Sequence, residues 1–345
     1  MINVGIIGAT GYAGAELIRI LLSHKQVNIS AVSSVSFAGS VYSDIYPAFR
    51  GIFDQKCGNS DFVTGNADIV FAAVPHGLSE DIAEKVLQNS GRLIDLGADF
   101  RLESEDDYTA WYGPPYSKKS LHDLSVYGLP ELYRDKIPGA KIVANPGCYP
   151  TSIALGLAPV LRHGLAVPEQ GIICDSKSGV SGAGRGLAQN LHFVECDGSF
   201  CSYKTAAHRH TPEIEQVLSD VCGSPVTVTF APHLLPVTRG ILSTCYVRLK
   251  AQVSEKTVRD AYETAYENEP FVRLLPSGAN ANIKAVRYSN LCDISLHTDL
   301  RTHTLIVTSA IDNMVKGAAG QAIQNMNLLC GFPETSGLLG VPPAF

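Results

Sequence analysis

The sequence predicts an α/β protein that combines a Rossmann-type, doubly wound parallel sheet with an inserted α+β domain built on a mixed sheet. Over residues 1–147, short apolar runs alternate with helical patterns, as in parallel strands joined by helical crossovers. Beyond Cys148 the apolar runs are longer and rich in β-branched residues, which indicates a mixed or antiparallel sheet. At 345 residues, with 45% hydrophobic and 17% charged side chains, the chain is long enough for two domains.

The expected elements follow this division. In the first part we expect helices at 15–23 and 79–89, and strands at 2–7, 28–33, 69–73, 93–96 and 141–144. In the second part we expect helices at 153–161, 212–218 and 254–267, and strands at 172–176, 226–231, 242–249 and 304–310. A last helix, at 313–329, is expected to return to the first domain. The predicted domains are a discontinuous nucleotide-binding domain, 1–147 with 313–345, and a substrate and dimerisation domain, 148–312.

Charge and composition exclude several classes of function. The net charge is −6, the pI is near 5.9, and no run of Lys and Arg occurs, so we expect no nucleic-acid partner. No apolar run approaches the roughly 18 residues of a membrane helix, and the N-terminus lacks the pattern of a signal peptide, so we expect no membrane partner and a cytoplasmic location. The nine cysteines contain no CxxC pair, so we expect free thiols and no metal.

A glycine-rich turn connects the first expected strand to the first helix. Its glycines permit a sharp turn and let a pyrophosphate approach the helix N-terminus closely. The spacing is GxxGxxG, and its position directly after a strand is what makes it a dinucleotide fingerprint. We therefore predict cofactor contacts from Gly8, Thr10, Gly11, Tyr12, Ala13 and Gly14.

The second strand ends in Ser33-Ser34, and no carboxylate follows closely. An NAD site would normally place Asp or Glu here to bind the adenosine ribose. Small hydroxyl residues leave room for a 2′-phosphate and can hydrogen-bond to it, so both serines are predicted to contact NADP.

Cys148 is the predicted nucleophile. It lies in Asn145-Pro146-Gly147-Cys148-Tyr149-Pro150-Thr151, between a strand and an apolar helix, with Pro150 expected at the first helical position. The N–H groups of that helix favour a thiolate and can receive an oxyanion. A thiolate beside a nicotinamide predicts attack on an activated acyl group, followed by reduction of the thioester through a hemithioacetal.

Two histidines, His208 and His210, precede another helix, for which Thr211 is the expected N-cap and Pro212 the first residue. An imidazole suits proton exchange with the hemithioacetal oxygen. The spacing does not decide which histidine acts, although the position of His210 closer to the helix slightly favours it. A further histidine, His233, is expected to be structural, between strands.

The loop from Ser178 to Arg185 is rich in glycine and serine, so its backbone N–H groups could form an anion-binding concavity for phosphate or the nicotinamide edge. The predicted contacts are Ser178, Gly179, Ser181 and Gly182. Candidate cations for a substrate carboxylate or phosphate are Lys204, Arg209 and Arg239.

Together these motifs resemble those of the N-acetyl-γ-glutamyl-phosphate reductases over essentially the whole chain. Besides the segments above, the resemblance is carried by Pro75-His76-Gly77, Gly97-Ala98-Asp99-Phe100-Arg101-Leu102, Tyr127-Gly128-Leu129-Pro130-Glu131, His208-Arg209-His210-Thr211-Pro212-Glu213 and Asp312-Asn313 through Ala322. Eight matches in order are far more specific than any one of them.

The resemblance implies reduction of a small acyl phosphate, N-acetyl-γ-glutamyl phosphate, by NADPH in arginine biosynthesis, with phosphate released. It implies Cys148 as nucleophile, one of His208 and His210 as acid/base, and Asn313 near the nicotinamide. It also implies a homo-oligomer, which we expect to be a dimer or tetramer. From the matching motifs we add Asn145, Arg101 and Glu213 as predicted substrate contacts.

Three alternatives stay open at this point. Aspartate-semialdehyde dehydrogenases share the chemistry, but they resemble one another by a Gly-His step where this chain has Gly240-Ile241. Reductases of aminoadipyl phosphate are separated poorly by sequence. A protein that senses NADP(H) without catalysis would keep the fold, and the intact turn around Cys148 argues against it.

Overall fold

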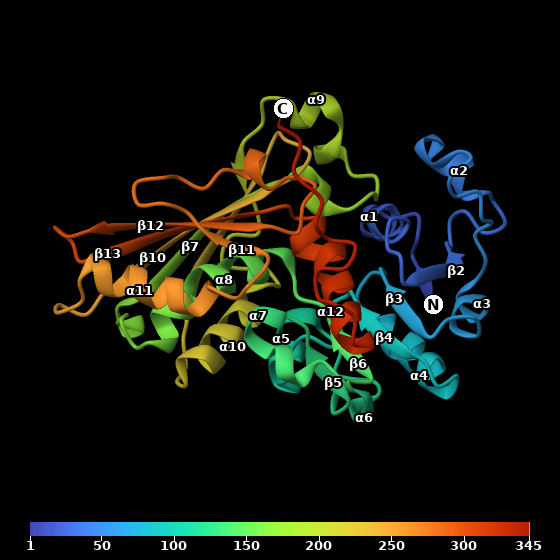
Figure 1. Ribbon diagram of the computed structural model, residues 1–345, viewed down its shortest axis with the longest axis horizontal. Coiled ribbons are helices and arrows are strands. Elements are labelled where there is room, and N and C mark those ends of the chain that lie inside the picture. The colour runs from blue at the N-terminus through green and yellow to red at the C-terminus, as the bar shows by residue number, and fades with distance from the viewer. Residues whose placement is uncertain (345) are drawn as a thin grey trace. The chain divides into compact units, whose positions relative to one another are not determined.

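The computed structural model describes residues 1–344 and divides the chain into two compact units (Figure 1). The first comprises Met1–Pro146 and Ala318–Leu339, and the second comprises Gly147–Gly317 together with 340–344. The predicted division placed 147, 313–317 and 340–344 in the first unit, and the structure groups them with the second. Gly317 N–H, for example, donates to the carbonyl of Asp312 at 2.9 Å.

The first unit contains a six-stranded sheet in the order β2-β1-β3-β4-β6-β5, and every pair in it is parallel. Its strands are β1 (Ile2–Ile7), β2 (Val27–Ser33), β3 (Ile69–Ala72), β4 (Arg92–Asp95), β5 (Ser125–Tyr127) and β6 (Ile142–Ala144). Its helices are α1 (Tyr12–Leu21), α2 (Tyr42–Ile45), α3 (Ser60–Thr64), α4 (Ser79–Gln88), α5 (Glu105–Tyr112), α6 (Lys119–His122), α7 (Pro130–Tyr133) and α12 (Gly320–Cys330).

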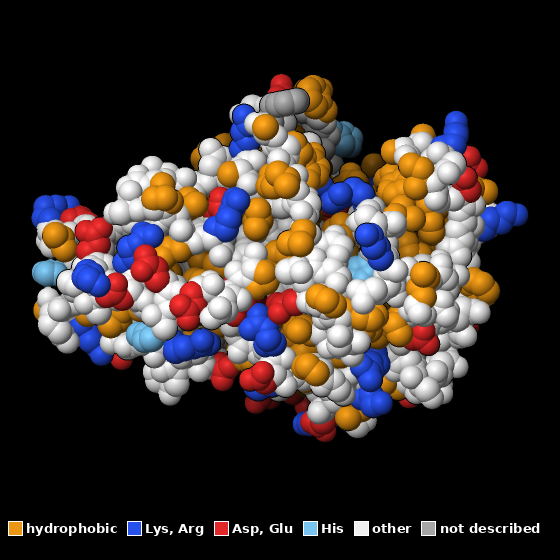
Figure 2. Space-filling view, viewed as in Figure 1, with side chains coloured by type: hydrophobic (Ala, Val, Ile, Leu, Met, Phe, Trp, Pro, Cys, Tyr) orange, Lys and Arg blue, Asp and Glu red, His pale blue; other side chains and the backbone are white. Residues whose placement is uncertain are grey.

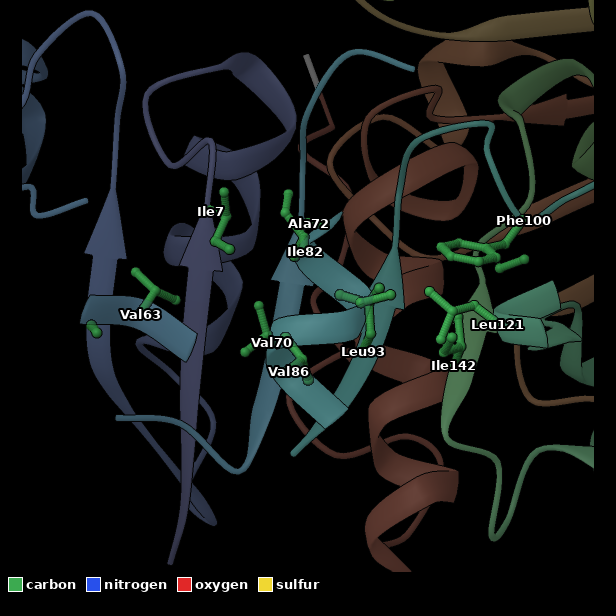
Figure 3. Close-up of a cluster of buried hydrophobic side chains, with 13 residues drawn as sticks. Ile7, Val63, Val70, Ala72, Ile82, Val86, Leu93, Phe100, Leu121 and Ile142 are labelled. Carbon is green, nitrogen blue, oxygen red and sulfur yellow. The ribbon is translucent and has the colours of Figure 1, made fainter. Parts of the chain in front are cut away.

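Both faces of this sheet are covered, as a doubly wound fold requires. Apolar side chains of α3 and α4 pack on one face, and Figure 3 shows Val63, Ile82 and Val86 against strand residues such as Val70 and Leu93. Helices α1 and α12 lie together on the other side, where α12 contacts β4. The last helix therefore returns to the first sheet, and the predicted fold class is confirmed.

The second unit contains a mixed, seven-stranded sheet in the order β11-β12-β13-β10-β7-β9-β8. Its strands are β7 (Ile172–Gly179), β8 (Cys201–Ser202), β9 (Val228–Leu235), β10 (Ile241–Arg248), β11 (Val272–Leu274), β12 (Cys292–Asp299) and β13 (Thr304–Ile311). Its helices are α8 (Cys148–Arg162), α9 (Phe193–Cys196), α10 (Thr211–Cys222) and α11 (Glu255–Tyr266).

One face of the mixed sheet is covered by α8, which α10 and α11 flank. Inward-facing residues of the central strands, such as Cys174, Cys245 and Val307, are fully buried there. The opposite face is half-exposed along Asp175, Thr244 and Ile306, and Ile173 is 48% exposed. Figure 2 shows basic and acidic side chains intermingled over the part of this unit that carries α11, where Lys256 pairs with Asp260.

The turn between β1 and α1 depends on a glycine at position 8. Gly8 has φ +80°, and a Cβ atom there would lie 2.2 Å from the carbonyl oxygen of Ala73. By contrast Gly11, with φ −73°, is the N-cap of α1, and its Cβ would meet nothing closer than 3.4 Å. The backbone at position 8 therefore requires glycine, whereas position 11 has room for a side chain.

We predict that Gly8→Ala lowers the free energy of unfolding by at least roughly 1–3 kcal/mol, because it combines a disfavoured backbone conformation with a backbone clash. The control Gly11→Ala, at an N-cap with room for a methyl group, should lower it by less than about 1 kcal/mol. Thermal and urea unfolding of the two variants make the comparison. Equal stability of both variants would contradict this account of the turn.

Candidate active site

Cys148 is the first residue of α8, and Gly147, in an extended conformation, is its N-cap. The helix begins earlier than predicted, so Pro150 is its third residue and not its first. The N–H groups of a first helical turn have no intrahelical partner, which is why a proline is tolerated at any of these positions. The half-buried thiol of Cys148 thus lies at a helix N-terminus, where the helix dipole favours the thiolate.

A buried carboxylate holds the backbone directly before Cys148. The N–H of Gly147 donates to Oε1 of Glu213 at 2.8 Å, and Glu213 is 1% exposed. The sequence motif predicts a substrate contact for Glu213. Its observed contact is with the nucleophile turn, and it fixes that turn relative to α10.

On its other side, Cys148 is bordered by a glycine that the sequence alone did not single out. Gly317 lies in a short π-helical turn, Val315–Ala319, and a Cβ atom there would be 2.7 Å from Cβ of Cys148. Any larger residue would push against the nucleophile.

The two histidines lie immediately before α10. His210 is the N-cap and Thr211 the first helical residue, so the prediction of Thr211 as N-cap was wrong by one position. Nδ1 of His208 accepts the backbone N–H of His210 at 3.1 Å. The rings of the two histidines are 4.9 Å apart between centroids, and the ring of Tyr149 is 6.0 Å from that of His210.

His208 is surrounded by aromatic rings, with centroids 5.6 Å away for Tyr149 and Tyr203 and 5.3 Å away for Phe230. Burial in this cage lowers the pKa of His208 to about 3, and the positive charges of His210, Lys204 and Arg209 act in the same direction. Hence His208 is neutral throughout the physiological range.

Two phenols near Cys148 were missed at the level of sequence. The hydroxyls of Tyr149 and Tyr203 lie 3.1 Å apart, and that of Tyr149 also donates to the carbonyl of His233 at 3.3 Å. Burial raises the pKa of Tyr149 and raises that of Tyr203 to about 12, with the charge of Cys148 contributing to both. Both phenols therefore stay protonated. His233, expected between strands, lies within β9.

The loop after β7 is not the open anion-binding concavity that we predicted. The N–H groups of Gly179, Val180 and Ser181 donate to carbonyl oxygens of Gly240, Val237 and Thr238, at 2.9, 2.9 and 3.1 Å. That prediction was wrong for these three groups, because strand-like pairing with 237–240 uses them.

Asn313 contacts the same loop. The resemblance implies that both lie near the nicotinamide. Oδ1 of Asn313 accepts the N–H of Gly240 at 2.7 Å, and its Nδ2 donates to Oγ of Ser181 at 2.9 Å. A Cβ atom at Gly182 would lie 3.6 Å from Nδ2 of Asn313 and 3.1 Å from Oγ of Ser178.

The candidate cations differ in exposure. Lys204 and Arg209 are exposed, and their charges reach His208. Arg239 is mostly buried, with Nε 3.3 Å from Oδ2 of Asp312 and the guanidinium over the ring of Tyr288. Since this pairing occupies Arg239, the exposed pair is better suited to an anionic substrate.

Two predicted substrate contacts lie in the first unit and are buried in hydrogen bonds. Arg101 donates to the carbonyls of Asn145 and Leu96, both at 2.9 Å. The side-chain amide of Asn145 donates to the carbonyl of Ala318 and accepts from Asn325, both at 3.1 Å. These contacts assign Arg101 and Asn145 a role in holding the backbone at the end of β6.

The turn after β1 provides a helix N-terminus without a competing side chain. No side chain within the described residues 1–344 caps α1, and the first turn of this helix contains no acidic residue. Thr10 Oγ1 and Ser34 Oγ are 2.7 Å apart, and Ser34 also accepts the N–H of Phe37 at 3.2 Å. Ser33 and Ser34 are both buried. The free N–H groups of α1 fit a pyrophosphate.

Within residues 1–344, no group of three or more His, Cys, Asp or Glu side chains is arranged to hold a metal ion. No helix in that range is long and apolar enough to cross a membrane.

Comparison with known families matches both parts of the chain. Residues 3–140 match a model described as the NAD binding domain of semialdehyde dehydrogenases, and 148–313 match the dimerisation domain of the same enzymes. The chain therefore belongs to the semialdehyde dehydrogenase family of oxidoreductases, and its cofactor is a nicotinamide dinucleotide.

Curated relatives narrow the family further. An N-acetyl-gamma-glutamyl-phosphate reductase of Clostridium botulinum (strain Eklund 17B / Type B) is 54% identical, and the match covers 100% of both chains. The enzyme of the same name from Brachyspira hyodysenteriae is 51% identical, again over 100% of both. Within its family, the chain belongs to the N-acetyl-γ-glutamyl-phosphate reductases.

Solved structures share the fold at low sequence identity. Aspartate semialdehyde dehydrogenase II of Vibrio cholerae superimposes with a TM-score of 0.73 at 17% identity, over 96% of this chain and 98% of that one. The Candida albicans enzyme, solved with NADP, gives 0.69 at 16%, over 95% and 98%. These likenesses show the fold alone.

Proposed function

We propose that this chain reduces N-acetyl-γ-glutamyl phosphate with NADPH to N-acetylglutamate semialdehyde and phosphate, through a thioester on Cys148. The observation that carries the proposal is the thiol at the first residue of α8, with its turn held by Glu213. The names of the relatives, at about half identity over full length, supply the substrate. The reaction would serve arginine biosynthesis in the cytoplasm.

In this mechanism the thiolate of Cys148 attacks the acyl carbon, and the bond to the phosphate oxygen breaks. The N–H groups at the start of α8 are suitably placed to stabilise the oxyanion on that carbon. When bound, the nicotinamide supplies the hydride that converts the thioester to a hemithioacetal. Collapse of the hemithioacetal releases the aldehyde and restores the thiolate.

His210 is the acid/base that exchanges a proton with the hemithioacetal oxygen. Nδ1 of His208 accepts the N–H of His210, so the single proton of this neutral ring lies on Nε2. With a pKa of about 3, His208 does not carry the second, acidic proton of an imidazolium near neutral pH, and it has no open nitrogen lone pair to act as a base. His210 is the remaining imidazole of the pair. The role of His208 is then to fix the backbone of His210, and the exposed Lys204 and Arg209 attract the anionic substrate.

NADP is favoured over NAD by the segment that follows β2. Residues 34–43 contain no carboxylate, and the first acidic residue after β2 is Asp44. Ser34 is buried against Thr10, so its hydroxyl shapes the loop, whereas Ser36 is exposed. A site without a carboxylate for the ribose hydroxyls accepts a 2′-phosphate.

We also infer a homodimer formed through the half-exposed face of the mixed sheet. Ile173, Tyr246 and Ile306 present apolar surface there, and the matched model of this region is described as a dimerisation domain. Pairing two dimers would give the alternative tetramer. Sedimentation showing a monomer at micromolar concentration would contradict this inference.

Replacing Cys148 tests the covalent mechanism. Cys148→Ala should bind NADPH normally and lose nearly all turnover, because no nucleophile remains to form the thioester. The assay is phosphate-dependent reduction of NADP with N-acetylglutamate semialdehyde, run in parallel with aspartate semialdehyde; Cys222→Ala, at a half-exposed cysteine, is the control. Retention of more than a few per cent of activity, or a preference for aspartate semialdehyde, would overturn the proposal.

The two histidines should respond differently to substitution. His210→Asn should lower kcat by about 10²–10⁴, the usual value of a proton-transfer group, with little change in NADPH affinity. His208→Asn should cost substantially less. Rates measured from pH 6 to 9 complete the test, because His208 stays neutral over that range and cannot shape the profile of the parent. If both variants kept the parental kcat and profile, the acid/base would lie elsewhere.

Introducing a carboxylate after β2 should shift cofactor selectivity. Ser34→Asp should weaken NADPH relative to NADH, since its charge repels the 2′-phosphate. Ser36→Asp brings the same charge at an exposed position and spares the buried contact with Thr10. The ratio of the two dissociation constants is the measurement. A parent that already prefers NADH would refute the assignment of NADP.

A further inference from the structure

The turn directly before the histidine pair has a rare backbone conformation. In residues 1–344, five residues other than glycine have a positive φ, and two of them, Lys204 (+46°) and Ala206 (+58°), lie in this turn. The carbonyl of Lys204 accepts the N–H of Ala207 at 3.0 Å. With Ala206 in the third position at positive φ, this hydrogen bond indicates a type II turn, in which that position is normally glycine or asparagine.

Side-chain packing does not impose this conformation, because all four residues of the turn, 204–207, are exposed. The chain is instead fixed on both sides of the turn. The N–H of Tyr203 donates to the carbonyl of Pro232 at 3.1 Å, and Nδ1 of His208 accepts the N–H of His210. Strained residues that are held in this way are found preferentially at ligand sites, where the strain keeps a binding conformation ready.

The two fixed ends place the turn beside the reacting groups. The hydroxyl of Tyr203 lies 3.1 Å from that of Tyr149, and the charge of Cys148 contributes to the raised pKa of Tyr203. At the other end, the charge of Lys204 helps to lower the pKa of His208. The turn is therefore close both to the nucleophile and to the histidine pair.

The turn also offers donors to an anion. Within the described residues 1–344, the ammonium of Lys204 forms no ion pair, and the N–H groups of Lys204, Thr205 and Ala206 donate to no protein group. By contrast, Arg239 pairs with Asp312, and the N–H groups of the loop after β7 bond to 237–240. A lysine ammonium and backbone N–H groups are among the usual ligands of phosphate in proteins.

An acyl phosphate requires such donors close to the nucleophile. Its phosphate is attached to the carbon that Cys148 attacks, whereas the carboxylate of N-acetyl-γ-glutamyl phosphate lies at the far end of a flexible chain. The phosphate group must therefore be bound next to the thiolate and the acid/base. An exposed turn meets this requirement and also leaves a path by which free phosphate departs.

We propose that the turn 204–207 is the subsite for the phosphate group of the substrate. The ammonium of Lys204 and the N–H groups of Thr205 and Ala206 bind the phosphate oxygens, and the positive φ angles hold these donors in place before the ligand arrives. Donors that are already ordered lose less entropy on binding. The inference rests on the proposed function, and it names the part of the substrate that this turn binds.

The reverse reaction tests the subsite with inorganic phosphate. In that direction a phosphate oxygen attacks the thioester carbon and the thiolate of Cys148 leaves, so phosphate occupies the same subsite. At constant ionic strength, Lys204→Met should raise the KM for phosphate roughly tenfold, because a charge-assisted hydrogen bond is lost. The KM for N-acetylglutamate semialdehyde should change less than about twofold. Lys250→Met, at an exposed lysine of the same unit, is the control and should change neither value.

Ala206→Gly tests the contribution of the backbone. Glycine relieves the strain and loosens the turn, so Tm should rise by roughly 2 °C while the KM for phosphate rises roughly threefold. His303→Gly is the matched control, because His303 is exposed between β12 and β13 and also has a positive φ, +50°. It should raise Tm similarly and leave both KM values unchanged.

Three results would contradict these assignments. An unchanged KM for phosphate in Lys204→Met or in Ala206→Gly would overturn the inference. Equal rises of both KM values in Lys204→Met would also overturn it, because they would show general attraction of anions and no phosphate subsite. A parent that shows no phosphate-dependent reduction of NADP with N-acetylglutamate semialdehyde would instead refute the proposed function.

Discussion

The N-terminal ends of two helices meet at the carboxylate of Glu213. It lies in the first turn of α10 and accepts the N–H of Gly147, the N-cap of α8, across 66 residues of sequence. A carboxylate buried to this degree is costly unless donors and favourable dipoles surround it, and two helix N-termini supply both. Because His208 and His210 directly precede α10, the contact that fixes the turn of Cys148 also fixes the histidine pair.

Local patterns were sufficient to predict much of this arrangement. The first strand was predicted at 2–7 and observed as Ile2–Ile7, because an apolar run that ends at a glycine-rich turn has few alternative conformations. Cys148 at the start of a helix followed from its flanking Gly147 and Pro150. The return of the last helix to the first sheet also came from pattern, although its start was placed too early: the chain passes through the π-helical turn before α12 begins.

What escaped prediction depends on partners distant in sequence. Strand β12 was not expected, because its Asp293 reads as a surface residue until it is seen opposite Arg273 of β11, with Nε and Oδ1 2.6 Å apart. The loop after β7 looked like an open anion site for a similar reason. Only the structure shows that its N–H groups pair with 237–240. Likewise, the sequence around Tyr203 contains no signal that its hydroxyl lies within hydrogen-bond distance of the hydroxyl of Tyr149.

The chain passes between the units at three points, and the first two, 146–147 and 317–318, have a consequence for how such a protein can arise. In the second unit, Gly317 lies against Cys148, so the segment Gly147–Gly317 begins and ends at the same place. In the first unit, Asn145 bonds to Ala318, so the gap left by that segment is equally narrow. A stretch with adjacent ends can be inserted into a loop, or removed from it with a short linker, while the host sheet keeps its strand order. Apart from 340–344, the second unit is thus one continuous segment carried within a single loop of the nucleotide-binding fold.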